Sequence, residues 1–342
     1  MIRLGGAALQ LASLFAVCLQ LIGCGNTKAG PTQVLAAGAP PDSALEREPI
    51  EPLPKSPGAS PEHARLGRRL FNDKRLSGDD SVACATCHDL KRGGVDGRAH
   101  SLGVSGKVGA VNAPTVLNAS LNFALFWDGR AATLEEQAGG PIQNPLEMAS
   151  SFSSVLQKLD RDADYVQTFK KLFADGLTEA NVRGAIADYE RTLLTPGSPF
   201  DRFLEGDKAA ISEQAKAGYL LFKGVGCVAC HQGRNVGGNM FQRFGVFGNY
   251  FKDRGNISEA DYGRFNVTHN EADRFVFRVP SLRYVAKTAP YLHDGSKQTL
   301  PEVVQVMAKY QLGRSLDDEQ VSQIVAFLSS LSGSDPSEAG AL

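Results

Sequence analysis

Two short stretches of the sequence could carry chemistry: CATCH at residues 84–88 and CVACH at residues 227–231. In each, two cysteines enclose two residues and a histidine follows directly, which is the pattern of c-type haem attachment. The two thiols would add to the vinyl groups of one haem, and the histidine would bind the iron as its proximal ligand. The sequence therefore predicts two covalently bound c-type haems. The residues that would hold them are Cys84, Cys87, His88, Cys227, Cys230 and His231.

The other common uses of paired cysteines explain this pattern less well. A thioredoxin-like C-x-x-C needs a βαβ setting, which the surrounding sequence does not predict. Zinc would use four ligands and gives no reason for a histidine after both pairs. Structural disulfides leave both histidines unexplained. The remaining two of the six cysteines, Cys18 and Cys24, lie in an apolar N-terminal segment.

Similar sequence surrounds the two motifs, and this internal repeat predicts the elements that hold them. Each motif follows an amphipathic helical pattern, which Ser60 and Pro61 would begin in the first half and Ser212 in the second. Another helical pattern closes each half. Upstream of the motifs, three residue types recur with the same spacing from one another: Gly67, Leu70 and Phe71, and then Gly218, Leu221 and Phe222. The apolar faces of the closing helices comprise Val182, Ile186, Tyr189 and Leu193, and then Ile324, Phe327 and Leu331.

The repeat predicts an all-α fold of two cytochrome c-like domains with long loops and one haem each. A length of 342 residues suits about two domains. We place the domains at residues 61–205 and 206–332, because residues 193–207 are rich in proline and glycine. Residues 25–60 lack helical periodicity and are rich in Pro, Ala and Gly, which predicts a flexible tether. Residues 333–342 would be a short tail.

The N-terminal residues predict export rather than a part of the fold. Arg3 precedes an apolar run that ends in LIGC at Cys24, which is typical of a secretion signal over residues 1–24. LIGC also resembles the lipobox of bacterial lipoproteins, and Gly25 after it favours the outer membrane. We therefore expect a periplasmic protein whose only membrane contact is a lipid anchor at Cys24. The formal net charge of −1 gives no reason to expect nucleic acid as a partner.

The sixth position of each iron decides between electron transfer and chemistry. The candidate methionines are Met148, Met240 and Met307. Met240 is too near His231 in the chain to cross to the opposite haem face, whereas Met307 lies on an expected helix late in the second domain. We therefore predict that His231 and Met307 bind the second iron, a pair that raises its reduction potential. The first domain offers no comparable late ligand.

Beyond the haem motifs, the chain resembles the bacterial dihaem cytochrome c peroxidase family. The matching stretches, from residue 62 to 331, are LGRRLFNDKRLS, FWDGR, LEEQA, NPLEM, TAPYLHDGS and MAKYQLG. The resemblance implies a low-potential peroxidatic haem in the first domain and an electron-transferring haem in the second. It also implies a homodimer that reduces hydrogen peroxide with electrons from a small cytochrome c or a blue copper protein.

The resemblance assigns catalytic roles to particular residues. Glu147 would be the distal acid–base group, and Gln137 would lie beside it. Trp127 would lie between the two haems. A carboxylate above an iron could take the proton from one peroxide oxygen and return it to the other.

The resemblance also implies a calcium ion between the domains. Its ligands would be Asn112 and the backbone carbonyls of Thr288 and Pro290, and oxygen ligands of these kinds suit calcium. His293, in the same YLHDG stretch, is expected to pack in the second domain or contact a propionate rather than bind iron.

One position departs from the family pattern. The family commonly has S-x-G-H in the loop after the first haem motif, and that histidine caps the peroxidatic iron at rest. Here the loop reads SLGVSG, with Val104 in the place of the histidine. Valine cannot bind iron, so we expect the first haem to be five-coordinate or water-bound at rest. His100, four residues earlier, is an alternative ligand.

Two other functions stay open at this point. A dihaem enzyme could use peroxide to oxidise residues of a partner protein, as the methylamine-dehydrogenase-maturing relatives do. Those relatives carry a tyrosine where Met307 stands. A non-enzymatic electron carrier would have both irons six-coordinate and would not depend on Glu147.

Overall fold

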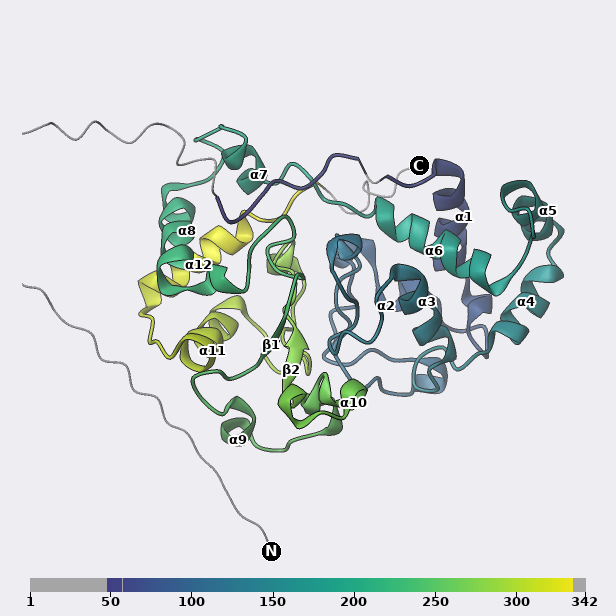
Figure 1. Ribbon diagram of the computed structural model, residues 1–342. Coiled ribbons are helices and arrows are strands. Elements are labelled where there is room, and N and C mark those ends of the chain that lie inside the picture. The colour runs from purple at the N-terminus through teal and green to yellow at the C-terminus, as the bar shows by residue number, and fades with distance from the viewer. Residues whose placement is uncertain (1–47, 57, 335–342) are drawn as a thin grey trace, which may run out of the picture. The chain divides into compact units, whose positions relative to one another are not determined.

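The computed structural model describes residues 48–56 and 58–334, and this part of the chain is mostly helical (Figure 1). The first-half helices are α1 (Pro61–Phe71), α2 (Cys84–Cys87), α3 (Leu134–Gln143), α4 (Phe152–Asp160), α5 (Ala163–Leu172) and α6 (Glu179–Thr192). The remaining helices are α7 (Pro199–Leu204), α8 (Glu213–Val225), α9 (Tyr250–Arg254), α10 (Phe265–Thr268), α11 (Leu300–Leu312) and α12 (Asp318–Ser329). The strands are β1 (Phe241–Arg243) and β2 (Val276–Arg278). The predicted signal segment and Cys24 lie outside the described residues.

Each half of the repeat brings together one entering and one closing helix. α1 packs against α6, and α8 packs against α12. A Cβ added at Gly67 would lie 1.8 Å from the Ala185 carbonyl oxygen, and one at Gly218 would lie 1.8 Å from that of Gln323. Both helix pairs therefore approach closely at a glycine, and the two glycines occupy matching positions of the repeat. The predicted all-α fold with two cytochrome c-like halves is confirmed.

The helix starts follow from local sequence. The hydroxyl oxygen of Ser60 accepts a hydrogen bond from the His63 N–H, and Pro61 occupies the first turn of α1. Ser212 does the same for α8, accepting from the Ala215 N–H at 3.1 Å. Each serine satisfies a backbone donor that the first helical turn leaves unpaired, so both predicted starts are confirmed.

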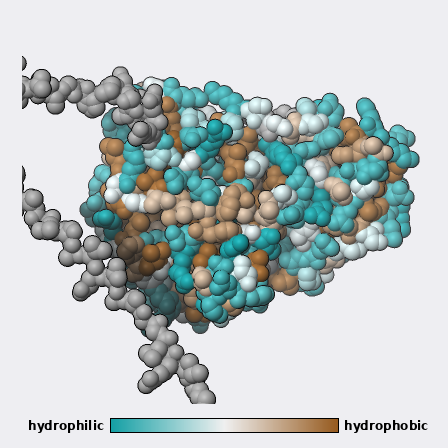
Figure 2. Space-filling model, viewed as in Figure 1, coloured by the Kyte–Doolittle hydropathy of each residue, from teal (hydrophilic) through white to brown (hydrophobic). Residues whose placement is uncertain are grey.

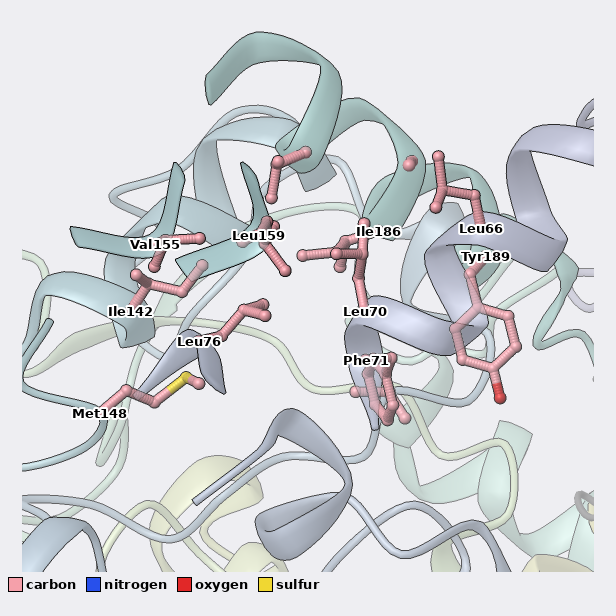
Figure 3. Packing of buried hydrophobic residues seen from close by; sticks show 14 of the residues in the cluster. Leu66, Leu70, Phe71, Leu76, Ile142, Met148, Val155, Leu159, Ile186 and Tyr189 are labelled. Atoms are coloured by element: carbon pink, nitrogen blue, oxygen red, sulfur yellow. The ribbon is translucent and has the colours of Figure 1, made fainter. Parts of the chain in front are cut away.

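The first half has its own apolar core, which lies between α1, α3, α4 and α6. Figure 3 shows Leu70 of α1 beside Ile186 of α6, and Leu76 beside Met148. Val182, Ile186, Tyr189 and Leu193 are all buried, as the helical periodicity predicts. Met148, one of the three candidate methionines, is therefore core packing.

The second half has a separate core rich in aromatic rings. The rings of Phe222 and Phe327 lie 5.0 Å apart, and Phe200 lies the same distance from Phe327. Phe200 belongs to α7, which we expected in the first domain. Because its side chain is fully buried in the second core, the division between the halves falls before Pro199 rather than after residue 205.

The end of the expected tether is also part of the second half. Residues 48–56 contain neither helix nor strand, but Ile50 is only 1% exposed and packs in the second core. Leu53 is also buried. The prediction of a flexible tether through residue 60 is therefore wrong for this segment. Ile50 and Leu53 alone do not form a periodic apolar pattern, so their burial could not be predicted from the sequence.

The small sheet lies in the long loops of the second half. β1 and β2 pair antiparallel, with Phe241 opposite Arg278. The Arg278 N–H also donates to the Trp127 carbonyl oxygen at 2.9 Å, which joins this sheet to a first-half loop. On the face seen in Figure 2, apolar residues are scattered in small groups among hydrophilic ones.

Among residues 48–56 and 58–334, no helix has the length and apolar character needed to cross a membrane.

Candidate active site

The first haem motif forms a single helical turn. Cys84 and Cys87 are the first and last residues of α2, so their side chains lie on the same face. His88 follows, and its N–H donates to the Cys84 carbonyl oxygen at 2.9 Å. Neither cysteine of this motif, nor Cys227 or Cys230 of the second, is in a disulfide. All four thiols are therefore available for thioether bonds, as c-type haem attachment requires.

His88 is oriented as a proximal iron ligand would be. Its Nδ1 donates to the Gly94 carbonyl oxygen at 3.1 Å, which leaves the Nε2 lone pair for a metal. Burial lowers the pKa of His88, so the ring is neutral at physiological pH. The ring of Phe71 lies 6.5 Å away.

His231 repeats this arrangement in the second half. The ring of Phe222, which matches Phe71 in the repeat, lies 6.4 Å from it. Burial lowers the pKa of His231 to about 4, so the ring is neutral at physiological pH. Unlike that of His88, its Nδ1 is buried without a hydrogen-bond partner among the described residues. A buried neutral imidazole suits a metal ligand.

Glu147 lies within electrostatic range of the first haem motif. Burial raises the pKa of Cys84 to about 12 and also raises that of Cys87, and the Glu147 charge adds to both effects. Burial raises the pKa of Glu147 itself, against the opposing effects of Arg130 and Asn144. Asn144 Nδ2 donates to Glu147 Oε1 at 2.6 Å, which leaves Oε2 for proton exchange.

The loop with Val104 is attached to the backbone of Glu147. The Val104 N–H donates to the Glu147 carbonyl oxygen at 2.8 Å. A Cβ added at Gly103 would lie 2.1 Å from the Leu146 carbonyl oxygen, so only glycine allows this approach. The Val104 side chain is buried in the first core, together with Met148. The loop thus holds a hydrocarbon side chain where the family commonly has its histidine.

Gln137 and Met307 lie on the helices expected for them, but their predicted roles are not tested. Gln137 is half-buried on α3, and its side chain makes no hydrogen bond to Glu147. Met307 is half-buried on α11.

Trp127 and Asn112 connect the two halves. Trp127 Nε1 donates to the Asn112 carbonyl oxygen at 2.9 Å, and its ring lies 6.3 Å from that of His293. The Asn112 N–H in turn donates to the His293 carbonyl oxygen at 2.8 Å. Asn112 Nδ2 donates to the Arg98 carbonyl oxygen, which leaves Oδ1 as a free oxygen ligand. The structure therefore brings Asn112 to the chain just after Pro290, and calcium at this junction stays a prediction.

His293 is part of a buried charged network. Its Nε2 lies 2.7 Å from Asp261 Oδ1, and Arg254 pairs with Asp261 at 2.6 Å and with Asp294 at 2.5 Å. Hydrogen bonds from His293 and Arg254 outweigh burial and hold the pKa of Asp261 far below its usual range. Arg254 offsets one of the two carboxylate charges, and His293 Nε2 is engaged by Asp261.

Arg278 is a residue that we did not predict from the sequence. Its side chain is only 4% exposed, and its guanidinium donates to the carbonyl oxygens of Phe126 and Val279. Among the described residues it has no carboxylate partner, and burial alone lowers its pKa to about 10. Buried charges are normally paired. A haem propionate would supply the missing anion, so Arg278 supports the haem assignment. An arginine inside the apolar stretch FVFRVP was the available signal.

Glu190 is a second residue that sequence reasoning missed. This α6 residue is buried, its Oε2 has no hydrogen-bond partner among the described residues, and burial raises its pKa to about 8. Its charge also raises the pKa of Cys84, so it lies near the first haem motif. The carboxyl is therefore neutral at pH 7.

Comparison with known proteins identifies the family. The family model for di-haem cytochrome c peroxidase matches residues 61–209. The chain is 47% identical to cytochrome c551 peroxidase of Nitrosomonas europaea, over 84% of this chain and 85% of that protein. It is 35% identical to the methylamine utilization protein MauG of Methylophilus methylotrophus, over 87% of this chain and 90% of that one. The chain therefore belongs to the di-haem cytochrome c peroxidase family, and this membership implies two c-type haems.

Another relative is longer than this chain. The cytochrome c peroxidase Ccp of Escherichia coli is 47% identical over 84% of this chain. The matched part of this chain spans only 61% of the length of that protein. Among solved structures, a MauG-like protein associated with microbial copper homeostasis is similar, with a TM-score of 0.73 and 28% identity. The similarity covers 84% of this chain and 94% of that protein.

Proposed function

We propose that this protein reduces hydrogen peroxide to water at the first haem. Electrons would come through the second haem from a small periplasmic cytochrome c or blue copper protein. The main support is family membership together with the position of Glu147 near the CATCH motif. When bound, the two haems supply the electrons and the iron that binds peroxide. Two electrons and two protons convert one hydrogen peroxide into two waters.

Glu147 is the proton carrier in this proposal. It takes a proton from one peroxide oxygen and returns it to the oxygen that leaves as water. Burial raises the pKa of Glu147, which makes its carboxylate a better base than an exposed one. Asn144 fixes the carboxylate through Oε1, so proton transfer uses Oε2.

Rapid mixing of the reduced protein with hydrogen peroxide tests this function. Glu147→Gln keeps the shape but removes the base, so it should slow the peroxide reaction by about 10²–10⁴-fold. Glu62→Gln, at an exposed site on α1, is the matched control and should react like the unmodified protein. Equal rates for both variants would contradict the proposal and favour the electron carrier.

The first haem is proposed to keep one iron position open at rest. The observation behind this is the buried Val104 side chain, whose backbone is bonded to Glu147. A high-spin ferric signal in the electron paramagnetic resonance spectrum of the oxidised protein is expected. A low-spin bis-histidine signal would contradict the open position.

His100 is the alternative ligand for that iron. It is half-buried, and its Nδ1 is buried without a hydrogen-bond partner among the described residues. If a low-spin signal were found, its loss in His100→Ala would assign the ligand. The same variant should have no effect on the spectrum if the position is open.

Oxidation of a partner protein is a second candidate function. It is favoured by the MauG-named relatives and by an open first haem. Against it stands Met307, at the position where those relatives have a tyrosine. Peroxide treatment with candidate periplasmic proteins, followed by mass spectrometry of the partner, separates the two functions.

The remaining expectations concern location and assembly. We propose a periplasmic protein with a lipid anchor at Cys24 and a homodimeric state. Mass spectrometry of the mature N-terminus tests the anchor, and sedimentation tests the dimer. Calcium bound by Asn112, Thr288 and Pro290 is tested by metal analysis of the protein and of Asn112→Ala.

A further inference from the structure

The segment Glu48–Leu53 crosses the second half beside the CVACH motif. Glu48 accepts hydrogen bonds from the Tyr219 hydroxyl and from Lys223 Nζ, both on α8. Ile50 is buried in the second core, and Leu53 is buried three residues later. The segment is therefore held at both ends and in the middle.

The central contact of this segment lies two residues after the haem-ligand histidine. The Gly233 N–H donates to the Pro49 carbonyl oxygen at 2.7 Å. Gly233 begins a tight turn, in which the Val236 N–H donates to the Gly233 carbonyl oxygen. The same turn lies against the haem-ligand histidine, because a Cβ added at Gly237 would lie 3.1 Å from His231 Nδ1. Hydrogen bonds thus connect Pro49 to a turn that packs against the His231 ring.

A buried arginine fixes the same segment from the other side. Arg283 is fully buried and pairs with Asp201 at 2.7 Å. Its Nη2 donates to the Glu51 carbonyl oxygen at 2.8 Å, and its Nε donates to the Arg234 carbonyl oxygen at 2.9 Å. One guanidinium group therefore joins Glu48–Leu53 to the turn after the haem motif.

Within residues 48–56 and 58–334, no N-terminal segment contacts the first haem motif in this way. His88 bonds to Gly94, and the adjacent Gly93 carbonyl oxygen accepts from the Thr115 hydroxyl at 2.6 Å. Thr115 comes from later in the same half. The contact with Glu48–Leu53 is thus a specific feature of the second site.

We propose that Glu48–Leu53 is a clamp that positions the His231 ring for the second haem iron. Because the clamp fixes the 233–237 turn, it fixes the backbone against which that ring packs. The orientation of a ligating histidine and the access of solvent to it tune the potential of the metal that it binds. Loosening the clamp therefore shifts the midpoint potential of the second haem. The proposal rests on the haem assignment and not on peroxide activity.

Two clamp variants and one matched control test this role in the full-length, haem-loaded protein. Ile50→Ala and Leu53→Ala each remove a buried clamp side chain. Ile142→Ala makes the same kind of cavity in the first core, away from the clamp. Both clamp variants should shift the midpoint potential of the second haem and leave the first unchanged. The control should leave the second-haem potential unchanged.

Amide hydrogen exchange at Gly233 provides a readout that does not depend on redox chemistry. The Pro49 bond protects this amide, so exchange should be at least about tenfold faster in Ile50→Ala and unchanged in Ile142→Ala. Unchanged second-haem potentials in both clamp variants would overturn the proposal, as would an equal shift in the control. The haem content of each variant, two per chain, checks the assignment separately.

Discussion

The hydrogen bond between Asn144 and Glu147 makes a quantitative prediction about proton transfer. Asn144 Nδ2 lies 2.6 Å from Glu147 Oε1 and stabilises the ionised carboxylate. A hydrogen bond to a charged group contributes about 1.5–3 kcal/mol. At about 1.36 kcal/mol per pH unit, Asn144→Ala should move the acid limb of kcat/KM upward by about 1–2 pH units.

The sign follows from the proposed role of Glu147 as a base. Burial already raises its pKa, so Glu147 becomes protonated at a higher pH than an exposed glutamate does. Removing the Asn144 donor raises the pKa of Glu147 further. As the pH is lowered, Glu147 is therefore protonated sooner, and the rate begins to fall at a higher pH than in the unmodified protein. The plateau above the limb should change much less than the limb position.

The assay is steady-state peroxide reduction from pH 4 to 9, at saturating electron donor. Gln143→Ala is the matched control, because that neighbouring amide donates to the Gly139 carbonyl oxygen and not to Glu147. An acid limb that stays in place in Asn144→Ala would refute the reasoning. So would an equal displacement in Gln143→Ala.

Three further predictions concern buried groups. Glu190 has a raised pKa of about 8, so the stability it provides is complete below pH 4.5 and is lost as pH rises to 8. Glu190→Gln should remove that loss in thermal unfolding measured across this range. Gly218→Ala should lower the free energy of unfolding by about 1–3 kcal/mol in denaturant unfolding, because the added Cβ meets α12. Gly184→Ala, on α6, places its Cβ in open space and should raise the free energy of unfolding by about 0.5–1 kcal/mol. Arg278→Gln removes a buried cation and should lower the midpoint potential of the haem whose propionate it pairs with, measured by spectroelectrochemistry.

Features that depend on residues close together in the chain could be predicted from the sequence. The C-x-x-C-H spacing, the serine caps at Ser60 and Ser212 and the apolar helix faces each depend on residues within a few positions. The repeat also contained a signal that we did not use. Gly67 and Gly218 stand at the same spacing from a following Leu–Phe pair, and both are close approaches between helices.

Features that depend on distant partners could not be predicted. Phe200 packs with the second core, although it lies in the stretch we assigned to the first domain. Ile50 lies in a sequence without periodicity, and only its contact with the second core reveals its burial. The partners of Arg278 come from residues 126 and 279, on both sides of the junction. In each case the decisive contact is set by tertiary packing.

The valine at position 104 removes the reason for this loop to move. In the family, a histidine in this loop leaves the iron when the enzyme is activated, so the loop must move. Here the Val104 N–H is bonded to Glu147, and Gly103 lies against the Leu146 carbonyl oxygen. Movement of this loop would break both contacts and disturb Glu147, the proposed acid–base residue. Because valine has no ligand to withdraw, the loop can keep Glu147 in one position in every redox state.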